Sequence, residues 1–275
     1  MDMTPVREIS VAINTAHRFV YFVPEAAEAY GRLGITERAP AYFAARSAPL
    51  GPVPWQITLA TFYNFSPRAV QAMAGVWDAA TPEAWQAARF AVVARAMDRV
   101  GVDLSAEEVA EARALIDPVV AAADLAGKPL AAANAALALP ADALTALWQQ
   151  VTVLREWRGD AHIAVLTANG LGPCACNVMQ TATGRFPVSL ARATRMWNDA
   201  EWADASARLA GRGWLAPDGT VTDAGTAARE QIELETDDLC APLWAAVGAD
   251  GAQRLAALLG RINDAFAAAG TFSQL

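Results

Sequence analysis

Residues Leu154–Leu166 read LREWRGDAHIAVL and hold the densest cluster of charged side chains in an otherwise apolar sequence. The segment before them carries apolar residues at intervals of three and four positions, namely Leu144, Leu147, Trp148, Val151 and Leu154. This spacing places them on one face of a helix. The sequence therefore predicts one long helix from Leu144 to Leu166 whose first half lies in the core.

The same helix face turns polar after Leu154 without leaving the core side. Its next positions are Arg155, Arg158, Ala161, His162 and Val165. A buried guanidinium is costly unless a carboxylate pairs with it, and Glu156 and Asp160 lie one turn apart on a neighbouring face. Two interpretations follow: a structural arginine–carboxylate pair on a helix that emerges into solvent, or the floor of a pocket where Arg158 and His162 bind a ligand.

The composition bounds the class of protein. Of 275 residues, 55% are hydrophobic and only 18% are charged, against a usual charged share of about 25%. We therefore expect much of the surface to be buried, either inside the fold or against a second copy in a homodimer. The net charge of −8 has the wrong sign for a protein that neutralises phosphates, which argues against DNA as a partner.

The N-terminal residues MDMTPVREIS show no apolar signal-peptide core, and Gly, Pro, Asn and Gln interrupt the longest uncharged runs. These features predict a cytoplasmic protein that neither spans nor binds a membrane. Cys174 and Cys176 form a C-x-C pair, and Cys240 is the third cysteine. An odd number of thiols argues against a disulfide framework, and the pair alone lacks the further ligands of a zinc site. We expect small core cysteines and no metal.

Helix start signals recur along the chain. Ser66–Pro67, Thr81–Pro82 and Ser105 each combine a capping side chain with a favourable first turn. One segment differs: Asp218–Gly219 followed by Val221 has the turn residues and the β-branched residue of a short hairpin. The expected fold is mainly α, with one short β-hairpin wing.

The chain also contains two series of similar landmarks. Pro67 precedes Trp77 by ten positions and TPEAW follows, while Pro187 precedes Trp197 by ten and NDAEW follows. These parallels predict tandem winged-helix-like repeats related by a pseudo-two-fold axis. The expected units are a helical winged-helix-like half over residues 1–125, a packed connector over 126–142, and a winged-helix half over 143–275. The two histidines, His17 and His162, would then occupy equivalent positions.

Residues from Pro187 to Asp238 resemble a winged helix of the MarR type. The matching features are the helix from Trp202 to Leu209, the turn Gly211–Gly213, the wing from Leu215 to Val221, and TDAG before a long helix. This resemblance implies a fold that reads operator DNA with the helix before the wing. Here that helix opens with acidic residues, which would repel DNA phosphates.

A larger part of the chain resembles a mainly bacterial family of helix-turn-helix proteins. The shared segments are HRFVYF with PEA, TFYNFSP, GVWDAATPEAW, GKPLAAANAAL, LREWRGDAHIA and the W-x(4)-W before the wing. Trp157 and Ala161 stand where the family pattern has His and Gly, which removes an additional histidine. The resemblance implies a fold and supplies no reaction.

The residue types permit acid–base chemistry, with His17, His162, Glu156 and Asp160 as candidate catalytic groups. No nucleophile elbow, phosphate loop, HExxH or dinucleotide-binding glycine pattern is present in the sequence, so no cofactor is predicted. A cofactor-independent enzyme is therefore one hypothesis, and a DNA-binding transcriptional regulator is another.

A small-molecule-binding protein is the hypothesis that the sequence favours. Arginine and histidine on a core-facing helix suit an anionic or aromatic ligand, and the many aromatic residues could form its walls. The candidate ligand-binding residues are Arg155, Arg158, His162, His17, Tyr21, Trp55, Tyr63 and Trp157. Such a protein would be a sensor or would sequester its ligand, on a winged-helix scaffold that has lost its DNA contacts.

Overall fold

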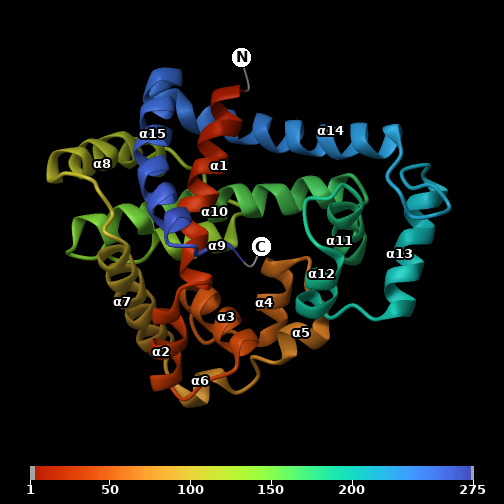
Figure 1. Ribbon diagram of the computed structural model, residues 1–275, viewed down its shortest axis with the longest axis horizontal. Coiled ribbons are helices and arrows are strands. Elements are labelled where there is room, and N and C mark those ends of the chain that lie inside the picture. Colours follow the sequence, from red (N-terminus) through yellow and green to blue (C-terminus); the bar gives the residue numbers. More distant parts are fainter. Residues whose placement is uncertain (1–3, 274–275) are drawn as a thin grey trace.

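The computed structural model describes residues 4–273; the outermost residues of the predicted halves 1–125 and 143–275 lie outside this range. Figure 1 shows a mainly helical molecule, as predicted. The first half of the chain contains α1 (Thr4–Arg18), η1 (Phe19–Tyr21), α2 (Pro24–Arg32), α3 (Arg38–Ser47), η2 (Ala48–Leu50), α4 (Trp55–Phe62), α5 (Pro67–Gln71), α6 (Val76–Ala79), α7 (Pro82–Val100), α8 (Ala106–Ala121) and α9 (Pro129–Ala135). The second half contains α10 (Ala143–Ala168), α11 (Pro173–Ala182), α12 (Val188–Arg195), α13 (Asp199–Gly211), α14 (Asp223–Cys240), η3 (Ala241–Ala246) and α15 (Gly248–Ala268).

The predicted capping residues begin their helices as expected. The side chains of Ser66 and Thr81 accept hydrogen bonds from backbone amides in the first turns of α5 and α7. Ser105 forms a reciprocal capping box with Glu108 at the start of α8. Each such cap satisfies an amide that the helix itself leaves free.

Helix α10 is the long helix predicted around Leu154–Leu166, and it runs through the middle of the fold (Figure 1). It packs against α1, α8, α9 and α14. Its residue Trp148 is 1% exposed, and burying a side chain of this size contributes at least roughly 1.5–3 kcal/mol. The predicted core face of this helix is therefore confirmed.

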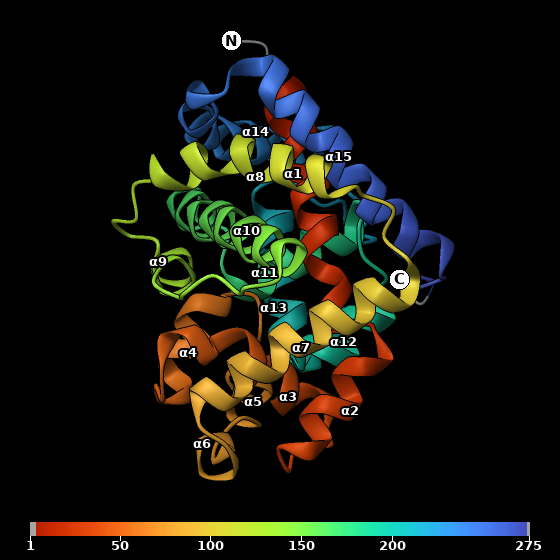
Figure 2. The same cartoon turned by 90° about the vertical axis from the view of Figure 1, so that its left-hand side faces the viewer.

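The two ends of the chain meet in the larger cluster of buried apolar residues. Helices α1 and α15 lie side by side (Figure 2), and the stacked rings of Phe19 and Phe266 are 3.9 Å apart. A smaller cluster gathers α11, α13 and part of α14. Helix α10 contributes Trp148 to the larger cluster and Val165 to the smaller one, so it joins them.

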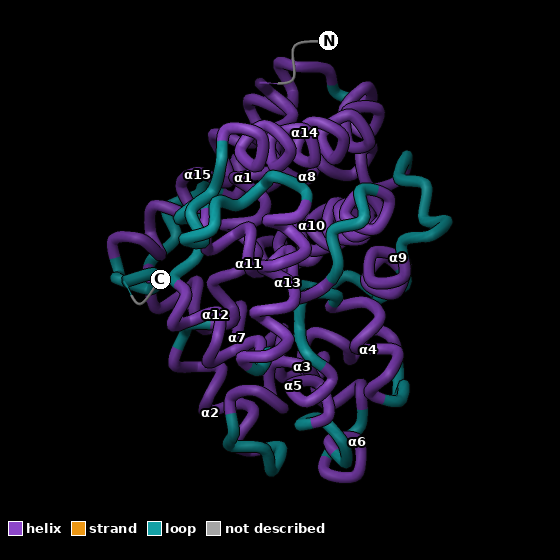
Figure 3. Tube along the Cα trace, turned by 90° about the vertical axis from the view of Figure 1, so that its right-hand side faces the viewer, coloured by secondary structure: helices purple, strands orange, loops and turns teal. Residues whose placement is uncertain are grey.

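The predicted β-hairpin wing is not confirmed. Within residues 4–273 the trace consists of helices and loops (Figure 3), and Leu215 and Val221 form one isolated antiparallel bridge. Thr222, the next residue, donates its backbone N–H to the Trp214 carbonyl oxygen at 3.1 Å and is also the N-cap of α14, so the chain enters the helix directly after the bridge. The tandem repeat and the winged-helix topology remain predictions.

Candidate functional site

A cavity of about 580 Å³ opens between α1, α10, α14 and η3, next to the loop that follows α11. Arg155, Arg158 and His162 of α10 all line it. Three of the sequence-predicted ligand-binding residues therefore share one wall. They do so because positions 155, 158 and 162 fall on one face of the helix.

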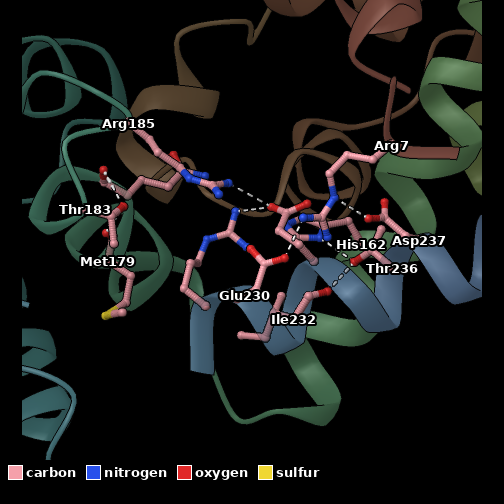
Figure 4. Close-up of polar contacts among 12 residues, drawn as sticks. Arg7, His162, Met179, Thr183, Arg185, Glu230, Ile232, Thr236 and Asp237 are labelled. Atoms are coloured by element: carbon pink, nitrogen blue, oxygen red, sulfur yellow. Dashed lines mark hydrogen bonds and ion pairs between the residues drawn. The ribbon is translucent and has the colours of Figure 1, made fainter. Parts of the chain in front are cut away.

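Arg158 is held by two carboxylates of α14. Its Nη2 atom lies 2.8 Å from Glu233 Oε2 and 2.9 Å from Asp237 Oδ1. Arg7 of α1 reaches the same network, with Nε 2.7 Å from Asp237 Oδ2. Figure 4 shows Arg7 and Arg185 approaching this network from opposite sides. Ion pairs thus connect α1, α10 and α14 around the cavity.

The cavity wall has more cationic than anionic groups. Five arginines line it, with Glu233 as the one acidic residue among the lining residues that the structure describes. Burial alone would raise the pKa of Glu233, but Arg229 and Arg158 lower it to about 2, so the carboxylate is ionised at neutral pH. Glu233 already accepts hydrogen bonds from Arg158, Arg185 and Arg229.

Three arginines beside the cavity retain donor capacity. Arg7 Nη2, Arg158 Nε and Arg229 Nη1 are buried and have no hydrogen-bond partner among the described residues. The Arg229 side chain is only 8% exposed. Buried donors without acceptors are uncommon in folded proteins.

His162 presents a defined tautomer to the cavity. Its Nδ1 atom lies 2.8 Å from Thr236 Oγ1, and the Thr236 hydroxyl donates to the Ile232 carbonyl oxygen at 2.8 Å. Because a hydroxyl has one hydrogen to donate, Thr236 must accept from Nδ1–H of His162. Burial lowers the pKa of His162 to about 4. The imidazole is therefore neutral at pH 7, and its Nε2 atom is a hydrogen-bond acceptor.

The structure does not bring His17 into this cavity. His17 is fully buried, with Nδ1 3.0 Å from Thr152 Oγ1 and Nε2 2.6 Å from Tyr21 Oη. Its ring stacks on Trp148 at 5.5 Å. Burial lowers the pKa of this imidazole well below its usual value. His17 and Tyr21 thus contact each other, one turn apart as their spacing indicated, inside the core.

The two carboxylates of the predicted site have separate partners. Glu156 accepts hydrogen bonds from Arg46 at 2.8 and 3.0 Å and from Arg155 at 2.7 Å. Although burial opposes ionisation, these two guanidinium groups hold the pKa of Glu156 well below its usual range. Asp160 Oδ2 accepts from the backbone amides of Leu130 and Ala131 at 3.0 Å. Glu156 thus belongs to a buried ion pair, and Asp160 caps α9.

The predicted aromatic walls lie elsewhere. Trp157 Nε1 donates to the Asp124 carbonyl oxygen at 2.7 Å, and Tyr63 Oη donates to the Leu171 carbonyl oxygen at 2.8 Å. Trp55 packs against the larger core cluster. The aromatic residue that does line the cavity is Trp244 of η3, which the sequence analysis did not single out.

Sequence reasoning also missed Arg7, Arg229 and Glu233. Arg7 and its partner Asp237 are 230 positions apart, so no local pattern relates them. The acidic run of α14, which includes Glu233 and Asp237, was the available signal. That run reads equally well as a solvated helix face.

The cysteines are buried free thiols, as expected. Burial raises the pKa of Cys176 and of Cys240 to about 12, so both thiols are protonated at neutral pH. Cys174 and Cys176 pack in the smaller core cluster, and Cys240 lies in the cavity wall.

Helices α12 and α13 are joined by the three residues 196–198, a connection length found in helix-turn-helix motifs. Among residues 4–273, no helix combines the length and apolar character needed to cross a membrane. Comparison with curated proteins finds no match, and comparison with solved structures finds none either. A model of a helix-turn-helix family matches residues 6–273, which is nearly the whole chain. The chain therefore belongs to this helix-turn-helix family.

Proposed function

We propose that the protein binds a small anionic molecule in the cavity between α1, α10 and α14, as a sensor or a sequestering protein. The observation that supports this most strongly is the lining of the cavity, where five arginines face Glu233, the single carboxylate residue in the described part of the wall. An anion in the cavity would be held by these guanidinium groups through charge-assisted hydrogen bonds.

The walls suit a ligand with an organic part as well. Trp244, Leu243 and Leu154 line the cavity beside the arginines. Small-molecule sites commonly combine apolar walls with a few polar groups that fix the orientation of the ligand. The volume of about 580 Å³ falls within the usual range of such sites. An aromatic anion matches both kinds of wall.

Calorimetric titration with phenyl phosphate, benzoate and inorganic phosphate tests this proposal, with benzyl alcohol as the neutral control. We expect the anions to bind and Arg158→Gln to weaken binding about 10–100-fold, since a charge-assisted hydrogen bond contributes about 1.5–3 kcal/mol. The fold should tolerate this change because Glu233 and Asp237 keep other arginine partners.

Arg254→Gln is the matched control. Arg254 pairs with Glu111 on the surface and does not line the cavity, so the substitution changes the net charge equally and should leave affinity within about twofold. The proposal fails if none of the three anions binds, or if both variants weaken binding to the same degree.

Family membership favours a second candidate, a DNA-binding regulator. The pair α12 and α13 has the connection of a helix-turn-helix, but the acidic residues of α13 oppose contact with phosphates. Asp199 is exposed beside Arg192, and Asp204 pairs with Arg208. A gel shift at physiological salt with the DNA upstream of the protein's own gene tests whether the protein is a DNA-binding regulator. A discrete complex supports regulation, and its absence at micromolar protein opposes it.

A further inference from the structure

The cavity contains one acceptor-only group that is not yet engaged. His162 Nδ1 is occupied by Thr236 at 2.8 Å, and Nε2 has no partner among the described residues. Because Nδ1 carries the hydrogen, Nε2 accepts and cannot donate. Burial keeps the imidazole neutral by lowering its pKa to about 4.

The carboxylate acceptors around the cavity are already occupied. Both carboxylate oxygens of Glu233 accept from arginines, and so do both oxygens of Asp237. A ligand in this cavity therefore meets guanidinium donors on several sides and an unprotonated imidazole nitrogen at His162.

This combination sets a condition on the ligand. An anion without a hydrogen would place an oxygen lone pair against the Nε2 lone pair of His162, and both would remain unsatisfied. An anion that retains an O–H group can accept from the arginines and donate to Nε2 at once. Hydrogen phosphate meets this condition, while sulfate has the same charge and nearly the same size but no hydrogen.

We propose that His162 makes the cavity selective for a hydrogen-bearing oxyanion of the phosphate type over sulfate. The inference rests on the proposed anion-binding function and specifies its ligand class. Free hydrogen phosphate and the monoanion of a phosphate ester share the required P–O–H group. His162 is then a specificity-determining residue that contacts the ligand directly.

Titration calorimetry of the full chain at pH 8 tests this selectivity, with sodium phosphate and sodium sulfate at matched ionic strength. At that pH hydrogen phosphate and sulfate are both dianions. We expect phosphate to bind at least about tenfold more tightly than sulfate. Phosphate makes the hydrogen bond to His162 Nε2 and sulfate leaves it unmade, and one such hydrogen bond typically changes affinity by this factor. Phenyl phosphate distinguishes a phosphate ester from free phosphate as the ligand. Its dianion lacks the P–O–H hydrogen and its monoanion has it, so the affinity for phenyl phosphate should rise as the pH falls from 8 to 5.5.

Two variants isolate the acceptor. His162→Phe removes it and should bring the phosphate-to-sulfate ratio to within about twofold of one, whereas His162→Gln restores an amide oxygen and should recover part of the preference. If phosphate, sulfate, phenyl phosphate and benzoate all fail to bind the wild-type protein, the proposed function itself fails. If only the aromatic anions bind, the function stands and this selectivity is wrong. If phosphate and sulfate bind with equal affinity, or if His162→Phe keeps the preference, the function likewise stands and this selectivity is wrong.

Discussion

At the scale of single residues, the two histidines have different surroundings and share one property. His17 lies in the core against Trp148, and His162 lines the cavity. Each histidine donates from Nδ1 to a threonine hydroxyl, and that hydroxyl donates in turn to a carbonyl oxygen one turn earlier in the helix. Thr152 donates to Trp148, and Thr236 donates to Ile232. Both imidazoles are therefore neutral acceptors at Nε2 near pH 7.

The protonation states can be measured directly. Since His17 and His162 are the only histidines in the sequence, their imidazole signals in an NMR pH titration are assigned with one variant. We expect neither to titrate between pH 5 and 8, because burial lowers both pKa values and brings that of His162 to about 4. A midpoint near 6.5 for His162 would contradict the neutral-acceptor assignment.

The lowered pKa of His162 also makes the stability of the fold depend on pH. Between about pH 4 and 6.5 the unfolded chain binds a proton at His162 that the folded protein does not bind. The contribution of His162 to the free energy of unfolding should therefore rise with pH across this window and be lost toward pH 4. Asp160, whose pKa burial raises to about 6, contributes with the opposite sign in the same window. His162→Gln should remove this contribution and make the free energy of unfolding rise less steeply with pH, as measured by urea denaturation at several pH values.

At the scale of secondary structure, Asp160 shows a role that local sequence could not reveal. Helix α9 begins after Lys128 without a side-chain cap of its own, and Asp160 supplies the acceptor from α10. We predict that Asp160→Ala destabilises the protein by about 2–4 kcal/mol, because two buried amides lose their acceptor. Asp160→Asn keeps an oxygen there and should cost less than half as much. Equal losses in urea denaturation would show that the cap contributes little.

The contact between α14 and the preceding turn allows a second prediction at this scale. A Cβ atom added to Gly225 would lie 2.2 Å from the Trp214 carbonyl oxygen, whereas one added to Gly260 of α15 meets nothing within 4 Å. Gly225→Ala should lower the free energy of unfolding by about 1–3 kcal/mol. Gly260→Ala should be neutral or stabilising by up to about 1 kcal/mol. Thermal unfolding of both variants tests the close contact between Gly225 and the Trp214 carbonyl oxygen. A neutral Gly225→Ala would contradict it.

Helix positions were predictable because their signals are local. Caps at Ser66, Thr81 and Ser105 and the apolar period before Leu154 each depend on residues a few positions apart. The short hairpin was not confirmed, since the chain enters α14 directly after the single bridge between Leu215 and Val221. Local turn residues indicate a turn and do not determine how far the strands continue.

At the scale of the whole molecule, α10 connects the two clusters of buried apolar residues, and the charged end of its core stripe lies beside the cavity. Sequence periodicity placed Arg155, Arg158 and His162 on one helix face, and all three line the cavity. It could not place Arg7 or Arg229, because tertiary packing alone brings α1 and α14 to that wall. The sequence landmarks also predicted equivalent positions for His17 and His162, whereas His17 lies in the core and His162 lines the cavity.

We propose that this arginine-lined cavity holds an anion. A crystal structure of the full chain soaked in sodium phosphate at pH 8 would show whether it does. We expect tetrahedral density in the cavity within about 3 Å of a guanidinium nitrogen of Arg158 or Arg229, with one phosphate oxygen at hydrogen-bond distance from His162 Nε2. Phosphate bound only at surface arginines such as Arg254, with water filling the cavity, would contradict it.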